Sequence, residues 1–144
     1  TQYDPTQSLY KDPKSLIAAR TFSDPPLNTV KVKKSGEGIF LEGGVRWKTT
    51  KYSNIPNGNY TLGFRAHHLK LNSSKTDDIK LLGEVLVTEL SGSESFVHLK
   101  SNENNWVVHT QGIYSYRQGE QIEMYLSISN CFLFDSDEIR VYEK

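Results

Sequence analysis

The histidines and carboxylates of this chain are the side chains whose types and spacing come nearest to a metal site. His98 and His109 fall in two neighbouring runs that read as strands, and Glu94 or Glu103 could complete a set of three ligands. Imidazole nitrogen and carboxylate oxygen are common zinc ligands. Histidines on strands also serve as polar cover on a sheet surface, and we adopt this second interpretation. We therefore predict no bound metal.

The motifs of enzyme active sites do not occur in the sequence. It has no phosphate-binding GxxxxGK[ST] loop, no GxGxxG, CxxC or HExxH, and no GxSxG. The lone Cys131 lies in the apolar run "SISNCFLF", which favours a buried thiol over a nucleophile. Asp77-Asp78 and the acidic run that starts at Asp135 sit in predicted turns, where Asp is expected for turn geometry alone. We predict that the chain is not an enzyme and holds no catalytic or cofactor-binding residue.

The charge balance argues against nucleic acid as a partner. The chain has 17 basic and 17 acidic residues and a formal net charge of zero, whereas nucleic-acid binding depends on an excess of Lys and Arg. Residues 1–78 hold 12 basic and 7 acidic side chains, and residues 79–144 hold 5 and 10. The first half of the chain is therefore basic and the second half acidic. This asymmetry fits ordinary solvent-exposed faces, or an electrostatic attraction between the two halves or between two copies of the chain. Several aromatic and basic residues could form a stacking surface for single-stranded nucleic acid. We expect them instead to lie in the core or at the rim of the barrel. They are Phe96, Trp106, Tyr114, Tyr116, Lys100 and Arg117.

Length and composition indicate one domain, or a domain with a short appendage. The chain has 144 residues, of which 36% are hydrophobic and 11% aromatic, which is enough for a core. A single cysteine excludes an intrachain disulfide and fits a reducing compartment. No run approaches the roughly 18 apolar residues of a membrane span, and no signal peptide opens the chain. Because the sequence begins at "TQYDP" without Met, we expect a fragment of a longer protein.

The elements that must position these side chains are mostly strands. Asp4-Pro5 and Asp12-Pro13 resemble helix starts, and "SDPP" then ends any helix. From Ile122 to Phe134 the apolar residues alternate as in one strand, with Asn130 as the exception. The polar run 72–78 is the best loop candidate. The other predicted strands are "LNTVKVKK", "IFLE", "VRWKTT", "YTLGFRA", "IKLLGEVLVTEL", "SFVHLK", "WVVHTQ" and "IRVYE".

Ten or so short strands bounded by Gly, Asn or Ser turns predict an all-β, closed or nearly closed architecture. "IFLE", the Gly pair and "VRWKTT" predict a hairpin. The loop at 72–78 would divide two small β units of the oligonucleotide/oligosaccharide-binding (OB) type.

The opening segment resembles the end of the nucleotide-binding domain of carbohydrate-type ABC importers. "TQYDPTQSLYKDPKSLIAARTFSDPPLN" follows, without a gap, the pattern that joins the ATPase domain of that family to its C-terminal domain. The matching positions are Gln2, Pro5, Leu9, Tyr10, Pro13, Ala19, Phe22, Pro26 and Asn28.

Three later stretches are similar to the C-terminal domain of the same family, in the same order. They are "YTLGFRAHHLKL", through Gly63, Arg65, His68 and Leu69, then "GEVLVTELSGSESFVHLK", then "YRQGEQIEMYLSISNCFLFDSD". Ala66-His67 departs from the usual Pro-Glu of the family. The chain thus resembles the C-terminal regulatory domain (TOBE, transport-associated OB) of maltose- and glycerol-phosphate-type importer ATPase subunits.

The resemblance implies a division of the chain. Residues 1–26 would be the helical tail of an absent ATPase domain with a linker, and 27–144 an OB-like TOBE domain, with two sub-barrels if it splits near 72–78. The apolar face of the tail, which includes Leu16, would pack on the ATPase domain in the full subunit and fold back or move in this chain. Family position alone supplies candidates for regulatory or interface contacts: Arg65, His67, Gly92, Ser93 and Glu94.

The resemblance also implies partners and a function. We expect the regulatory and dimerisation domain of an ABC importer for sugars, polyols or glycerol phosphate, at the cytoplasmic face of the inner membrane. Partners would be a second copy, permease subunits reached through the ATPase domain, and regulatory proteins. ATP and Mg²⁺ would belong to the parent subunit, with no cofactor in this chain. The alternative is an OB-type domain that binds a small oxyanion or nucleic acid.

Overall fold

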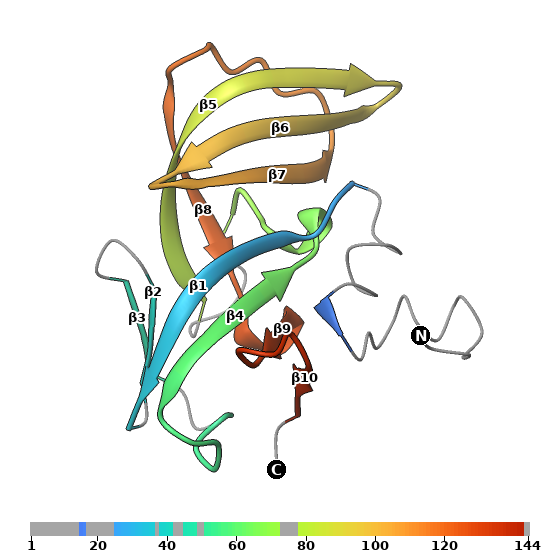
Figure 1. Ribbon diagram of the computed structural model, residues 1–144. Coiled ribbons are helices and arrows are strands. Elements are labelled where there is room, and N and C mark those ends of the chain that lie inside the picture. The colour runs from blue at the N-terminus through green and yellow to red at the C-terminus, as the bar shows by residue number, and fades with distance from the viewer. Residues whose placement is uncertain are drawn as a thin grey trace, which may run out of the picture.

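The computed structural model describes residues 15–16, 25–36, 38–41, 45–48, 51–72 and 78–142. Nearly all regular structure within them is β (Figure 1). The strands are β1 (Asn28–Ser35), β2 (Gly38–Leu41), β3 (Arg46–Lys48), β4 (Gly58–Phe64), β5 (Ile79–Ser91), β6 (Glu94–Ser101), β7 (Asn104–Gln111), β8 (Gln121–Leu126), β9 (Cys131–Phe134) and β10 (Arg140–Val141). Two short 3₁₀ helices are η1 (Ala66–His68) and η2 (Ile128–Asn130). The all-β prediction is confirmed.

The strands form two antiparallel sheets. The six-stranded sheet has the order β10-β9-β4-β1-β2-β3, and the four-stranded sheet has the order β7-β6-β5-β8. The predicted hairpin of β2 and β3 is confirmed by the pairing of Ile39 with Trp47. β5 curves from the body of the domain into an arm formed with β6 and β7 (Figure 1). Its first half pairs with β8 and its second half with β6, and a bulge between Val85 and Val87 lies near the change.

Alternation of apolar and polar residues explains which face each strand buries. In β1, Val30 and Val32 are buried while Lys31 and Lys33 point outward. Lys34 falls on the buried face, and its ammonium donates to the carbonyls of Ser53 and Ile55. A buried cation is tolerated here because carbonyl oxygens replace its hydration shell.

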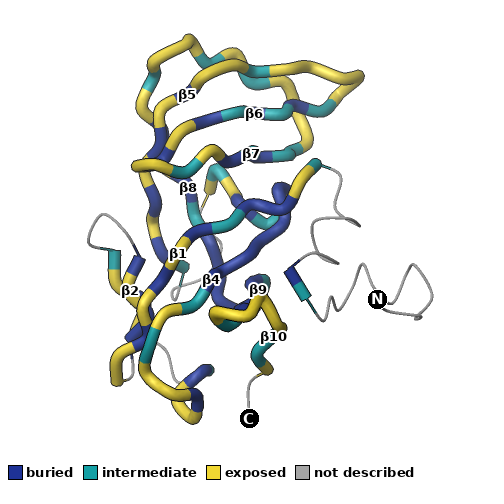
Figure 2. Tube along the Cα trace, viewed as in Figure 1, coloured by how far each residue is buried: buried dark blue, intermediate teal, exposed yellow. Residues whose placement is uncertain are grey.

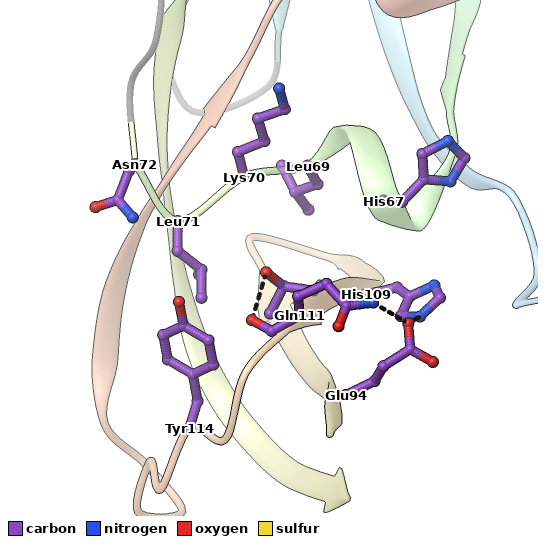
Figure 3. Close-up of a pocket in the computed structure, with 10 residues that line it drawn as sticks. His67, Leu69, Lys70, Leu71, Asn72, Glu94, His109, Gln111 and Tyr114 are labelled. Carbon is purple, nitrogen blue, oxygen red and sulfur yellow. Dashed lines mark hydrogen bonds and ion pairs between the residues drawn. The ribbon is translucent and has the colours of Figure 1, made fainter. Parts of the chain in front are cut away.

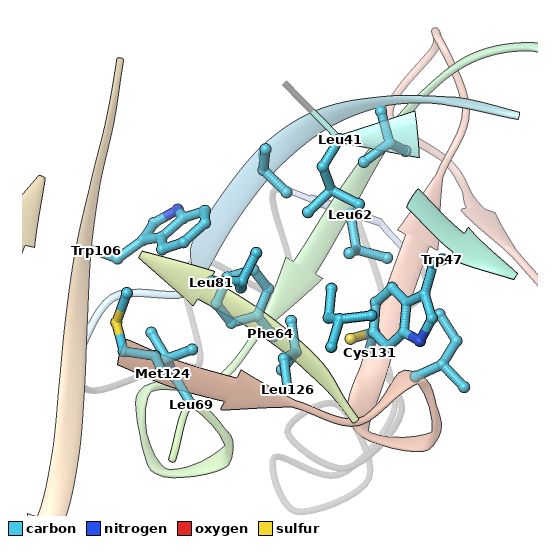
Figure 4. Close-up of a cluster of buried hydrophobic side chains, with 14 of the residues drawn as sticks. Leu41, Trp47, Leu62, Phe64, Leu69, Leu81, Trp106, Met124, Leu126 and Cys131 are labelled. Atoms are coloured by element: carbon cyan, nitrogen blue, oxygen red, sulfur yellow. The ribbon is translucent and has the colours of Figure 1, made fainter. Parts of the chain in front are cut away.

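Both sheets contribute to one continuous core (Figures 2 and 4). Phe64 of β4 meets Trp106 of β7 edge to face, with ring centroids 5.1 Å apart. Trp106 is 2% exposed, and its indole N–H donates to the carbonyl of Thr29 at 2.9 Å. Its predicted core position is therefore confirmed. Cys131 is also buried in this core, and burial raises the pKa of its thiol, as expected for an inert cysteine.

The single strand predicted from Ile122 to Phe134 is wrong. β8 ends at Leu126, η2 interrupts the alternation at Asn130, and β9 then joins the other sheet beside β4. The turn shifts the inward face by one residue, so Cys131 and Leu133 are buried while Phe132 is only half-buried. The apolar period continued across the break because β9 has apolar residues on both faces: Cys131 and Leu133 line the main core, whereas Phe132 and Phe134 pack in the smaller cluster with Leu16 and Leu27.

Most of the predicted helical tail lies outside the described residues. Leu16 is described, and it is 1% exposed in a small cluster with Leu27 and Phe134. Its backbone N–H donates to the carbonyl of Glu138 at 3.0 Å. At this residue the tail folds back on the β domain.

The predicted loop and domain boundaries stay predictions. Residues 73–77 lie outside the described part of the chain. Strands β1–β4, which precede them, form one sheet, and β5–β8, which follow them, form the other. The last two strands, β9 and β10, belong to the first sheet again. Among the described residues, no helix has both the length and the apolar character needed to cross a membrane.

Candidate functional site

A pocket of about 370 Å³ opens between the segment after β4 and the place where β6 begins and β7 ends (Figure 3). Pockets that bind small molecules commonly measure about 300–1,000 Å³. Its lining combines two planar amides, two hydroxyls (one of them phenolic), one carboxylate, two imidazoles, one ammonium and two leucines. The lining residues are His67, Leu69, Lys70, Leu71, Asn72, Glu94, His109, Thr110, Gln111 and Tyr114.

Glu94 is held in place at the mouth of this pocket. The Oε2 atom of Glu94 lies 2.9 Å from the Nε2 atom of His109 and accepts a 2.8 Å hydrogen bond from the amide of Gln111. The His109 ring stacks in turn on Phe96, with centroids 4.4 Å apart. The Oε2 atom therefore accepts two hydrogen bonds, which hold the Glu94 carboxylate in place but leave its negative charge at the pocket.

The buried hydroxyl of Ser95 brings Tyr114 to the pocket. It donates to the carbonyl of Gly112 at 2.7 Å and accepts the backbone N–H of Tyr114 at 3.1 Å. The N–H of Gly112 donates to the carbonyl of Ser93 at 2.7 Å. These bonds fix the course of the chain after β7 and therefore the position of the Tyr114 ring.

The histidines of η1 lie in a positively charged environment. Partial burial lowers the pKa of His67, and Arg65, His109 and Lys70 lower it further. Burial lowers the pKa of His68 to about 4, with further contributions from His67, Arg65 and Lys70. Both imidazoles are consequently neutral at pH 7, and the fixed positive charges around them are those of Arg65 and Lys70.

The structure brings two of the five predicted contact residues into this pocket, His67 and Glu94. Gly92 and Ser93 form the exposed turn next to it, where Gly92 has the left-handed φ of +61°. Arg65 is 5% exposed, and its guanidinium lies 5.0 Å from the centroid of the Phe132 ring. It is thus buried within the chain instead of on the surface. Interface roles for all five residues stay predictions.

The two strand histidines considered as metal ligands contact different glutamates. His98 lies 2.6 Å from Glu89, and His109 lies 2.9 Å from Glu94. Trp106 points from β7 into the core, away from this pair. Within the described ranges, no group of three or more potential metal ligands comes together.

Sequence reasoning missed most of the pocket. Asn72, Thr110 and Gln111 carried no recognisable motif, and Tyr114 was assigned only to core or rim. They meet because β7 ends beside η1, which is a long-range contact that no local pattern encodes.

Comparisons with known proteins agree with this fold. The chain is 25% identical over 139 residues to the sn-glycerol-3-phosphate import ATP-binding protein UgpC of Chromohalobacter salexigens. The match covers 93% of this chain but 37% of the relative, in its C-terminal part. The solved cytoplasmic molybdate-binding protein ModG, with molybdate bound, superposes with a TM-score of 0.52 at 16% identity. That alignment covers 74% of this chain and 94% of ModG. No protein-family model matches the chain.

These similarities confirm the resemblance drawn from the sequence. The chain is similar to the C-terminal region of an ABC importer ATP-binding subunit, and its fold is OB-like, of the TOBE type.

Proposed function

We propose that this chain is the regulatory and dimerisation domain of the ATP-binding subunit of an ABC importer. The observation that carries this proposal is the match to UgpC along 93% of the chain, in a domain with an OB-like fold. By itself the chain would be non-catalytic, and it would act as a rigid platform that tethers two ATPase domains as they open and close.

The packing of Leu16 supports this role. Leu16 lies in the segment that resembles the end of an ATPase domain, yet it is buried against Leu27 and Phe134. Because the Leu16 side chain fills a site in the β domain, pulling it out would leave a cavity there. Leu16 therefore couples the segment before the β domain to the β domain itself. Movement of the preceding segment would therefore be transmitted to the β domain.

The partners and the cargo belong to the same proposal. A second copy of the subunit, permease subunits and regulatory proteins are the expected partners, at the cytoplasmic face of the membrane. Sugars, polyols or glycerol phosphate are the expected cargo. ATP and Mg²⁺ would be bound by the ATPase part of the longer protein, since this sequence has no phosphate-binding loop.

A chimera tests this function. The region of UgpC matched by this chain is replaced by the chain itself, and uptake of sn-glycerol-3-phosphate is measured in cells without their own UgpC. We expect uptake above that of UgpC truncated at the same point and above that of a chimera with an unrelated OB domain. Uptake no higher than in these two controls would contradict the proposal.

A second candidate function is the binding of a small oxyanion in the pocket beside η1. It is favoured by the ammonium of Lys70 in the pocket lining and opposed by the carboxylate of Glu94 in the same lining. ModG, whose fold is similar, is a molybdate-binding protein.

Titration with phosphate, sulfate and molybdate, followed by calorimetry and by NMR of the His67 ring, tests this candidate. Bound anion should raise the pKa of His67, and Lys70→Gln should weaken binding, whereas Lys48→Gln on the other sheet should not. No anion-dependent shift at His67 would contradict it.

A further inference from the structure

A second pocket, of about 200 Å³, lies at the other end of the β6–β7 hairpin from the pocket beside η1. Its walls are the β6–β7 turn, the first part of β5, the strand β1 and the β2–β3 hairpin (Figure 1). That volume equals about seven water molecules at about 30 Å³ each. A ligand is therefore limited to one small ring or a chain of a few carbon atoms.

The deep part of this second pocket is apolar and rigid. Four of its lining side chains belong to the main core: Val30, Leu41, Leu81 and Trp106. The Trp106 ring is fixed by the hydrogen bond from its N–H to the Thr29 carbonyl and by its edge-to-face contact with Phe64. A ligand would thus meet a preformed surface suited to C–H groups, as in most small-molecule sites.

Polar groups replace apolar ones where β6 and β7 reach the second pocket. The inward positions of β7 are Asn104, Trp106 and Val108, and Asn104 is half-buried at the pocket. Its side-chain amide makes no hydrogen bond with any of the described residues. Ser101, which pairs with Asn104 across the hairpin, is buried and donates to the carbonyl of Leu82. The Asn104 amide therefore offers a donor and an acceptor to whatever fills the pocket.

The first part of β5 adds backbone groups on the same side. Tyr125, which lies opposite Lys80, exchanges both of its backbone hydrogen bonds with Lys70. The backbone groups of Lys80 must then point away from β8 as well, because the two residues form a non-hydrogen-bonded pair. On that side β6 pairs with β5 only from Glu84 onward, and no described strand pairs with residues 79–83. The N–H and C=O of Lys80 are thus free to bond to a ligand.

The second pocket carries no uncompensated charge among the described residues. Lys80 is the one charged residue that lines it, and its ammonium lies 3.0 Å from the carboxylate of Glu123. A charged ligand would have to break this ion pair or lose its hydration without a counter-charge. A neutral ligand meets neither cost.

We propose that the second pocket binds a neutral polyhydroxy compound, of the size of a monosaccharide or a smaller polyol. The C–H groups of the compound would pack on Trp106 and the leucines. Its hydroxyls, which both donate and accept, would bond to the Asn104 amide and to the backbone of Lys80. The site shares no lining residue with the pocket beside η1, so it is independent of anion binding there and of the importer function.

Titration with myo-inositol, glucose and glycerol, followed by NMR of the indole N–H signals, tests the binding. The chain has two tryptophans, both 2% exposed, but Trp106 lines the second pocket and Trp47 does not. We expect a saturable shift of the Trp106 signal, without one of the Trp47 signal, for at least one of these compounds. Cyclohexanol, a six-carbon ring with a single hydroxyl, should bind at least tenfold more weakly than the best polyol.

Three results would overturn the proposal. The first is the absence of a saturable Trp106 shift with every polyol up to about 100 mM. The second is an equal shift of both tryptophans, which would report a general effect of the solvent. The third is cyclohexanol binding as tightly as the polyols, which would make the site an apolar one.

Two neighbouring asparagines of β7 provide matched variants. Asn104→Leu removes the amide at the pocket with little change in volume and should weaken polyol binding tenfold or more. Asn105→Leu makes the same change on the exposed face of the strand and should leave the affinity unchanged. Equal affinities of the two variants would contradict the assigned contact.

A filled pocket gives a test that keeps the amide. Val45 lines the second pocket from the β2–β3 hairpin and is half-buried. Val45→Phe should place a ring in the space for the ligand and abolish the polyol-dependent shift of Trp106. The Trp47 and Trp106 signals without ligand report whether each variant is folded. Undiminished binding by a folded Val45→Phe would show that the polyol binds elsewhere.

Discussion

The side chain of Asn28 pairs with the backbone of Val107 as a neighbouring strand would. Its amide donates to the Val107 carbonyl at 2.9 Å and accepts the Val107 N–H at 2.8 Å. Asn28 begins β1 in one sheet, whereas Val107 lies on β7 at the edge of the other sheet. One side chain thus covers a sheet edge and joins the two sheets.

Replacing Asn28 with Ala should destabilise the domain by about 1–3 kcal/mol, since two hydrogen bonds are lost and the Val107 groups are left unpaired. The free energy of unfolding is measured by urea denaturation. Asn105→Ala on the same strand is the control, because Asn105 is exposed. Equal stability of both variants would mean that the contact contributes nothing.

Leu16→Ala should lower stability by about 2–5 kcal/mol, the usual cost of truncating a buried leucine. Denaturation should be combined with limited proteolysis, which should cut before residue 25 faster than in the unmodified chain. Leu82→Ala is the matched control, since Leu82 is a leucine that is 59% exposed and lies on β5. A variant as stable and as resistant as the control would refute the docking of this segment.

Gly83→Ala should destabilise the core although the change adds a single methyl group. A Cβ atom at residue 83 would lie 2.8 Å from Leu99 Cδ1 and 2.9 Å from Met124 Cε, so one of these side chains must shift. We expect a loss of about 1–3 kcal/mol by thermal or urea unfolding. Unchanged stability would show that the core at this point is looser than the structure has it.

The pKa of His68 predicts how stability depends on pH. An unfolded histidine titrates near pH 6.5, and the folded value for His68 is about 4. Between these values the unfolded chain binds a proton that the folded chain excludes, so stability is full above pH 6.5 and falls toward pH 4. His68→Gln should show a shallower fall in the free energy of unfolding over this range. An unaltered slope would place the acid sensitivity elsewhere.

Local patterns predicted the strands well because one face of each strand is buried. Alternation marked β1, and a Gly pair marked the hairpin of β2 and β3. Alternation failed between Ile122 and Phe134, because it cannot tell one long strand from two strands in different sheets that share a core.

The candidate site was predictable only in part. His67 and Glu94 came from a resemblance to a family, and the structure places both in one pocket. Tyr114 reaches that pocket through hydrogen bonds to Ser95, and Asn28 pairs with a residue 79 positions away. Contacts of this kind depend on how the two sheets pack together, which cannot be predicted from a short stretch of sequence.

The central claim, that this domain serves an importer ATP-binding subunit, is tested most directly by reading the coding sequence upstream of Thr1. The account predicts an in-frame ATPase domain with a Walker A loop, a signature motif and a Walker B strand. An upstream sequence without these motifs would contradict it.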